Sequence, residues 1–155
     1  MQLDKFSDYA LRVLVALAVA PQDRLSSAKI AQKYGLSQHH IAKVATQLVR
    51  NGFVVSDRGR GGGLRLAKNA DAIRIGAVLR TIKINDAVVE CMGDNKTCTI
   101  LPACGLRTPL ARARDAFFDV LDEYSLADVT TQHTALAQLL AIDVENLTTA
   151  PILPS

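Results

Sequence analysis

Residues 35–66, GLSQHHIAKVATQLVRNGFVVSDRGRGGGLRL, indicate the fold most clearly. Ser37 is a favourable N-cap, and it predicts a helix that runs to about Asn51. Apolar residues within this helix recur at i, i+3, i+4 and i+7, the spacing of one buried face: Ile41, Val44, Ala45 and Leu48. This face is therefore expected to pack against a core.

The opposite face of the same helix is polar and cationic. At about 100° per residue, it brings together His39, Lys43, Thr46 and Arg50, with His40 and Gln47 beside them. Such a face suits a helix that lies in the major groove of DNA, although an ordinary solvated face has the same composition. The segment that follows the helix favours DNA binding.

That segment predicts a β-hairpin wing. Phe53–Val55 and Leu64–Leu66 are expected to be short strands, joined by the glycine-rich tip RGRGGG at residues 58–63. A nucleotide-binding loop is the alternative, but its glycine motifs need a lysine or a following helix, and here a strand follows. Glycines let the backbone approach phosphate, and arginines can contact phosphate or enter the minor groove. The predicted DNA-binding residues are Ser37, Gln38, His39, His40, Lys43, Arg58, Arg60, Gly61, Gly62, Gly63 and Arg65.

Two further helices are predicted before this stretch. Residues 3–20 have apolar side chains at helical spacing, at Phe6, Leu11, Leu14, Val15 and Ala18, and Pro21 ends the run. Ser26 or Ser27 can cap a short helix through Tyr34, and Gly35 supplies a left-handed C-terminal residue. A short helix, a turn with glycine and a second helix have the spacing of a helix-turn-helix.

The charge distribution agrees with an anionic partner for the first half of the chain. Residues 1–66 contain ten Lys/Arg and four Asp/Glu, a net charge of +6, whereas the remainder contains eight and eleven, a net charge of −3. The apolar run 11–20 contains Arg12 and is too short to span a membrane, and Asp4 and Asp8 precede it, unlike a secretory leader. The sequence thus predicts a cytoplasmic protein without a membrane partner.

Downstream of the wing, the pattern predicts a fourth helix over 71–82 that packs against the winged unit, and then a loop over 85–106. Thr108 and Pro109 predict the start of a long helix. Its apolar residues follow the 3, 4 spacing of a helix that pairs with another, although two heptads also suit a core helix: Leu110, Ala113, Phe117, Val120 and Tyr124. A short helix from Thr130 through Leu140 and a tail with two prolines are expected to end the chain.

The expected fold class is mainly α with a small β wing, a winged helix-turn-helix with an added dimerisation helix. The corresponding parts are the DNA-binding unit at 1–84, the cysteine loop at 85–106, the dimerisation helix at 107–129, and a short helix and tail at 130–155.

All three cysteines of the chain lie in the 85–106 loop. Cys91, Cys98 and Cys104 are spaced C-x6-C-x5-C, and three thiols in one loop of a cytoplasmic protein favour ligation over a disulfide framework or simple packing. Structural zinc usually takes four ligands in close C-x2-C pairs. Iron–sulfur clusters accept wider thiolate spacing and a non-thiolate fourth ligand, so the pattern favours an iron–sulfur cluster.

At this point the chain resembles a known family. The segments KFSDYALRVLVALA at 5–18, GLSQHHIAKVATQLVRNGFV at 35–54, RGRGGGLRLA at 58–67 and ECMGDNKTCTILPACGL at 90–106 are similar to the Rrf2 family of bacterial winged-helix regulators. Within that family, residues 98–129 are most similar to the NsrR branch of nitric-oxide-sensing repressors. In the branch that regulates iron–sulfur biogenesis, a histidine follows the last cysteine by three residues, and here that residue is Arg107.

The resemblance implies a homodimer that binds a palindromic operator and senses nitric oxide through an iron–sulfur cluster, 4Fe–4S rather than 2Fe–2S. It implies that Cys91, Cys98 and Cys104 are ligands and that Asp8, from the opposite subunit, is the fourth. Without the resemblance, Asp8 would be an ordinary acid in the first turn of a helix.

Three alternatives remain open. The first is an iron or iron–sulfur-status sensor on the same fold. The second is a redox enzyme or electron carrier, for which the sequence offers no nucleophile–base motif or organic-cofactor fingerprint, so the chain is predicted not to be an enzyme. The third is an interaction module without DNA binding, which the basic glycine-rich wing disfavours.

Overall fold

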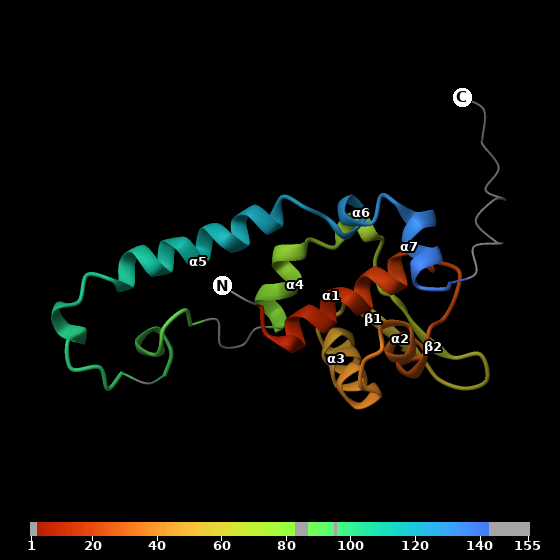
Figure 1. The fold of residues 1–155 in the computed structure, drawn as a ribbon, viewed down its shortest axis with the longest axis horizontal. Helices are drawn as coiled ribbons and strands as arrows, with labels where there is room; N and C mark the ends of the chain where they lie inside the picture. Colours follow the sequence, from red (N-terminus) through yellow and green to blue (C-terminus); the bar gives the residue numbers. More distant parts are fainter. Residues whose placement is uncertain (1–2, 83–86, 95, 143–155) are drawn as a thin grey trace, which may run out of the picture.

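The computed structural model describes residues 3–82, 87–94 and 96–142. These residues form a mainly helical fold with one antiparallel hairpin (Figure 1), so the predicted class is confirmed. The α-helices are α1 (Lys5–Ala18), α2 (Ser27–Tyr34), α3 (Gln38–Arg50), α4 (Ile75–Ile82), α5 (Arg107–Asp122), α6 (Leu126–Val129) and α7 (His133–Leu139). The strands are β1 (Val54–Asp57) and β2 (Gly63–Leu66), and three short 3-10 helices are η1 (Ala70–Ala72), η2 (Glu90–Met92) and η3 (Leu101–Ala103).

The helix-turn-helix forms as the sequence predicts. The Ser26 hydroxyl accepts a hydrogen bond from the Lys29 N–H, and Gly35 ends α2 with a left-handed φ of 63°. The buried residues of α3 are the four of the predicted stripe, Ile41, Val44, Ala45 and Leu48. Because these side chains pack against α1 and α2, the polar face of α3 is turned outward.

Helix α1 is the central element of the core, and its buried face differs from the prediction. It ends at Ala18 rather than residue 20, and Phe6, expected on the apolar face, is 36% exposed. Leu14 and Ala18 are buried as expected, and the other buried residues are Ser7, Ala10, Val13, Ala16 and Leu17. The reason is that neighbouring elements pack close to this helix on several sides, α3, α4, β2 and α6.

The predicted helix over 71–82 is wrong in its first turn. Residues 70–72 form η1, and α4 begins only at Ile75. Between them, the Ile75 N–H donates to the Tyr124 carbonyl at 3.0 Å, and the Leu126 N–H donates to the Ile73 carbonyl at 2.8 Å. Tertiary backbone pairing therefore replaces the intrahelical hydrogen bonds that a continuous helix would make.

The long helix also has different ends from those predicted. It begins at Arg107 with Leu106 as its N-cap, two residues before the predicted N-cap Thr108. Pro109 fits there because the first N–H groups of a helix have no intrahelical partner. The helix ends at Asp122, not at 129, because Ser125 and Asp128 form a capping box that starts α6. Hydrogen bonds from Ser125 hold the pKa of Asp128 below its ordinary value.

The C-terminal helix α7 lies within the range predicted for it, residues 130–140, and it packs beside α2. Lys33 Nζ donates to the carbonyls of Leu140 and Ala141 at 2.9 and 2.7 Å, which joins the end of α7 to the helix-turn-helix. The proline-bearing tail lies outside the described residues. Of the helices described, none combines the length and hydrophobicity needed to cross a bilayer.

Candidate nucleic-acid interface and cysteine segment

The outward face of α3 presents the predicted DNA-contacting side chains together. Ser37 is the N-cap without a side-chain capping bond, and it is exposed, as are Gln38, His39, His40 and Lys43. The His39 and His40 rings lie 6.0 Å apart, and the ring of Tyr9 in α1 lies 6.4 Å from that of His40. The exposed imidazoles and the ammonium can therefore all donate hydrogen bonds outward.

The hairpin forms the predicted wing, with each strand displaced by about one residue from its expected bounds. Val54 pairs with Leu66 and Asp57 with Gly63, so residues 58–62 close the turn. Arg58 and Arg60 are exposed at its tip. Gly61 has a φ of 74°, and a Cβ on Gly62 would approach the Gly59 carbonyl oxygen to 2.9 Å. The turn geometry itself thus requires these two glycines.

A cleft of about 550 Å³ lies between the wing and the helix-turn-helix. Its apolar floor comes from α3, and its hydroxyl and guanidinium groups come from three elements: Ser26, Ser27, Thr46, Arg50 and Ser56. The predicted residues of α3 and of the wing therefore lie on elements that share one grooved surface. Donors of this kind are those that bind phosphate in protein–DNA complexes.

Arg65 lies on the wing as predicted, but its guanidinium has an acidic partner. Its Nε donates to Asp57 Oδ2 at 3.1 Å, and Arg24 Nη1 lies 2.9 Å from the same oxygen. The sequence pattern does not indicate Arg24, because this residue precedes α2 by three residues and belongs to no motif. The backbone pairing of Leu25 with Leu64 brings it to the wing.

The cysteine segment, residues 87–94 and 96–106, lies at the far end of α5 and away from α2 and α3 (Figure 1). Cys91 is in η2, Cys104 follows η3, and Cys98 is exposed between them. All three thiols are free, and none is buried. Among the residues described, no three His, Cys, Asp or Glu side chains are grouped as metal ligands would be.

Asp8 lies in the first turn of α1 and is engaged within its own helix. Its carboxylate receives Arg12 Nε at 3.1 Å and Nη2 at 2.9 Å, both from the next turn. The hydrogen bond to Asp8 raises the pKa of Arg12. Burial raises the pKa of the neighbouring Tyr34 to about 12, and its hydroxyl donates to the Arg12 carbonyl at 3.0 Å.

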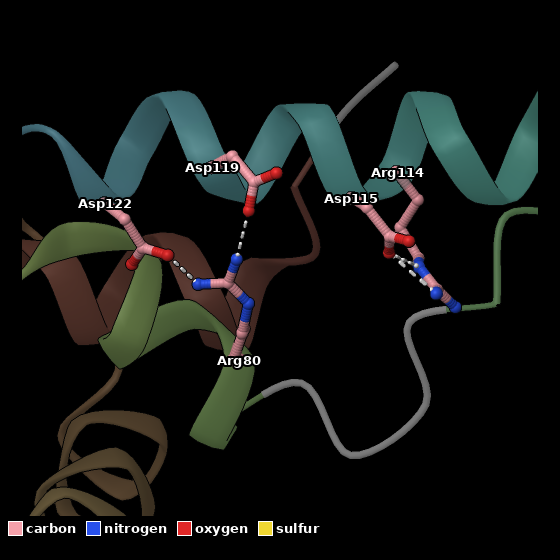
Figure 2. Close-up of polar contacts among 5 residues, drawn as sticks. All are labelled: Arg80, Arg114, Asp115, Asp119 and Asp122. Carbon is pink, nitrogen blue, oxygen red and sulfur yellow. Dashed lines mark hydrogen bonds and ion pairs between the residues drawn. The ribbon is translucent and has the colours of Figure 1, made fainter.

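Helix α5 is fixed to the winged unit through α4. Arg80 of α4 binds the carboxylates of Asp119 and Asp122 (Figure 2), and its guanidinium lies 5.1 Å from the Phe118 ring centroid. Phe118 is the buried residue of α5. The apolar stripe predicted for pairing is largely uncovered, since Val120 and Tyr124 are about half exposed.

Comparison with known proteins decides the family. The family model for Rrf2, described as an iron-dependent transcriptional regulator, matches residues 3–132. The chain belongs to the Rrf2 family. Like its relatives in this family, it is a transcriptional regulator, and the Rrf2 match includes the helix-turn-helix, the wing, the cysteine segment and α5.

Solved structures agree with the Rrf2 assignment. The global cysteine regulator CymR of B. subtilis is 30% identical, with a TM-score of 0.67, over 85% of this chain and 98% of that one. CymR of Staphylococcus aureus is 26% identical, with a TM-score of 0.64, over 81% and 95%. IscR of T. potens, at 20% identity, shares the fold with a TM-score of 0.67 over 97% and 93%.

Proposed function

We propose that this Rrf2-family regulator is a repressor that binds a palindromic operator as a homodimer and releases it when nitric oxide reacts with an iron–sulfur cluster. The observation that carries the proposal is the donor set of the cysteine segment. Three free thiols share a segment of two short 3-10 helices, and none is used in core packing. Thiolates in such number suit iron–sulfur ligation.

The thiols of the cysteine segment have the chemistry that a cluster needs, and because the described residues do not group them as ligands, cluster binding would have to bring them together. Cys91, Cys98 and Cys104 are accessible from solvent, and thiolate ligands are soft donors that suit iron–sulfur clusters. When bound, a 4Fe–4S cluster supplies iron with which nitric oxide can react. Three thiolates leave one iron of such a cluster to a different ligand, for which Asp8 of the opposite subunit is proposed.

In this proposal Asp8 is either a ligand of the cluster or the ion-pair partner of Arg12. A carboxylate is a hard ligand and a poor match for iron that thiolates otherwise hold, so its bond is the easiest to lose. Arg12 then offers the ion pair that the structure contains. Loss of Asp8 as a ligand would release α1 of one subunit from the cysteine segment of the other.

The uncovered stripe of α5 supports the homodimer. Val120, Tyr124 and Leu106 are about half or more exposed, and a second copy of this helix would cover them. A dimeric helix-turn-helix protein needs its recognition helices about 34 Å apart to fit successive major grooves. Loss of the tie between α1 and the opposite subunit changes that spacing and so weakens operator binding.

A sensor of iron or of iron–sulfur status is the second candidate. The description of the matching family model as an iron-dependent regulator favours it. It uses the same three thiolates and the same DNA-binding surface. The two candidates differ in the stimulus that releases DNA, which is iron removal for the second and nitric oxide for the first.

DNA binding through α3 is tested by Lys43→Ala. Lys43 is exposed on the outward face of α3, so its loss removes a phosphate contact without disturbing the core. We expect affinity for a labelled mixed-sequence duplex to fall about fivefold, and the slope of log affinity against log salt to decrease by about 0.9. Fluorescence anisotropy over a salt series measures both.

The matched control is Arg112→Ala, which removes one exposed positive charge from α5 and should leave the slope unchanged. Wild-type protein that bound no DNA, or bound it without salt dependence, would contradict the DNA-binding proposal. It would instead indicate an interaction module on the same fold.

A further inference from the structure

Two arginines from distant parts of the chain share one carboxylate at the turn end of the wing. Arg24 Nη1 lies 2.9 Å from Asp57 Oδ2, and Arg65 Nε donates to the same oxygen at 3.1 Å. The side chains of Arg24 and Arg65 are 48% and 45% exposed, whereas that of Asp57 is 27% exposed. The group therefore has a net charge of +1 at the surface.

The backbone fixes Arg24 in this position. The Leu25 N–H donates to the Leu64 carbonyl at 3.2 Å, and the Leu64 N–H donates back to the Leu25 carbonyl at 2.9 Å. This isolated antiparallel bridge joins the loop before α2 to the free edge of β2. A Cβ on Gly63 would lie only 3.1 Å from the Arg24 carbonyl carbon, so a glycine permits the close approach.

Each guanidinium uses only part of its hydrogen-bonding capacity on Asp57. Arg65 contacts the carboxylate through Nε, and its two Nη groups make no hydrogen bond within the described part of the chain. Arg24 approaches it with Nη1. The remaining N–H groups can therefore bind a second anion, and guanidinium groups match phosphate oxygens in geometry.

The surroundings indicate which anion this is. Asp57 directly precedes the wing tip, where Arg58 and Arg60 are exposed. None of Arg24, Asp57 and Arg65 lines the cleft between the wing and α3. Arginines grouped at the turn end of a wing can contact a DNA backbone. An exposed ion pair contributes little to stability, so folding alone gives little reason for two arginines on one acid.

We infer that Arg24 is a further DNA-phosphate contact and that Asp57 is a positioning residue that orients Arg24 and Arg65 toward the DNA backbone. The inference rests on the proposed DNA-binding function and extends it to residues outside the recognition helix and the wing tip. Asp57 restricts the rotamers of both arginines, so less side-chain freedom is lost when the phosphates bind.

The direction in which one substitution changes DNA affinity distinguishes a positioning role of Asp57 from a purely electrostatic one. Removing a carboxylate near DNA should strengthen binding if Asp57 only repels phosphate. Under the inference, Asp57→Asn instead weakens binding of the labelled mixed-sequence duplex by about threefold, and Asp57→Glu restores most of the loss. Arg24→Ala lowers the salt slope by about 0.9, whereas Arg112→Ala does not.

Fluorescence anisotropy on the full chain measures these affinities, and circular dichroism verifies that each variant is folded. An unchanged salt slope for Arg24→Ala, or tighter binding by Asp57→Asn, overturns the inference about Arg24 and Asp57. If the wild-type protein still binds the duplex, the DNA-binding proposal stands. A wild-type protein that fails to bind the duplex overturns both.

Discussion

Cys98→Ser is expected to remove the visible absorption of the cluster and to lower operator affinity by about a thousandfold, to the non-specific level. The side chain is exposed and outside the core, so the change should leave the fold intact. It replaces a soft thiolate with a hydroxyl, which is a poor ligand for iron held in a cluster. The measurement is the visible spectrum of anaerobically purified protein, with anisotropy on a duplex selected by wild type from a random-sequence pool.

Thr99→Ser is the matched control, because Thr99 lies in the same exposed turn and is not one of the proposed cluster ligands. Asp8→Ala tests the fourth ligand in the same assay. The Asp8→Ala variant should keep the three thiolates but weaken operator binding and the response to nitric oxide. Its comparison is Arg12→Gln, which removes the ion pair and keeps the Asp8 carboxylate. The ligand set would be wrong if Cys98→Ser stayed coloured and bound operator like wild type.

Gly76→Ala is expected to lower the free energy of unfolding by about 1–3 kcal/mol. Gly76 is buried where α4 crosses α5, and an added Cβ would lie 2.6 Å from the Phe118 carbonyl oxygen and closer still to the Asp122 carboxylate. That carboxylate is one of the two that Arg80 binds (Figure 2). The substitution therefore forces apart the contact that joins the winged unit to α5.

The sign of this effect is informative, since alanine in a helix interior is ordinarily about 1 kcal/mol more favourable than glycine. Urea unfolding of the two proteins, followed by circular dichroism, measures the difference. Gly105→Ala is the control, because a Cβ at that position meets no atom within 4 Å. Equal or greater stability of Gly76→Ala would mean that α4 and α5 are not packed as described.

The helix-turn-helix and the wing could be predicted because their signals are local. The buried face of α3 follows from its own periodicity, and Gly35 marks the end of α2 by its conformation. The hairpin strands follow from apolar residues on either side of a glycine tip. Only their bounds shifted by about a residue.

One error arose where distant segments meet, and the other at a local helix start. The backbone bridge between Arg74 and Ser125 interrupts the predicted fourth helix, and the capping box at Ser125 starts a separate helix after the long one. The capping box is a local S-x-x-D signal that the sequence carries, whereas the bridge has no period or motif in the sequence. The same holds for the candidate site, because only the fold brings Arg24 to Asp57.

Nitric oxide sensing through a cluster is tested by measuring operator binding during nitric oxide addition. Anaerobically purified wild-type protein is titrated with nitric oxide while its visible spectrum and its anisotropy on the selected duplex are recorded together. We expect a coloured protein that binds tightly and releases DNA in proportion as the cluster absorption is lost. Release on iron chelation with indifference to nitric oxide would contradict nitric oxide sensing in favour of an iron sensor, and a colourless protein that binds regardless would contradict the cluster itself.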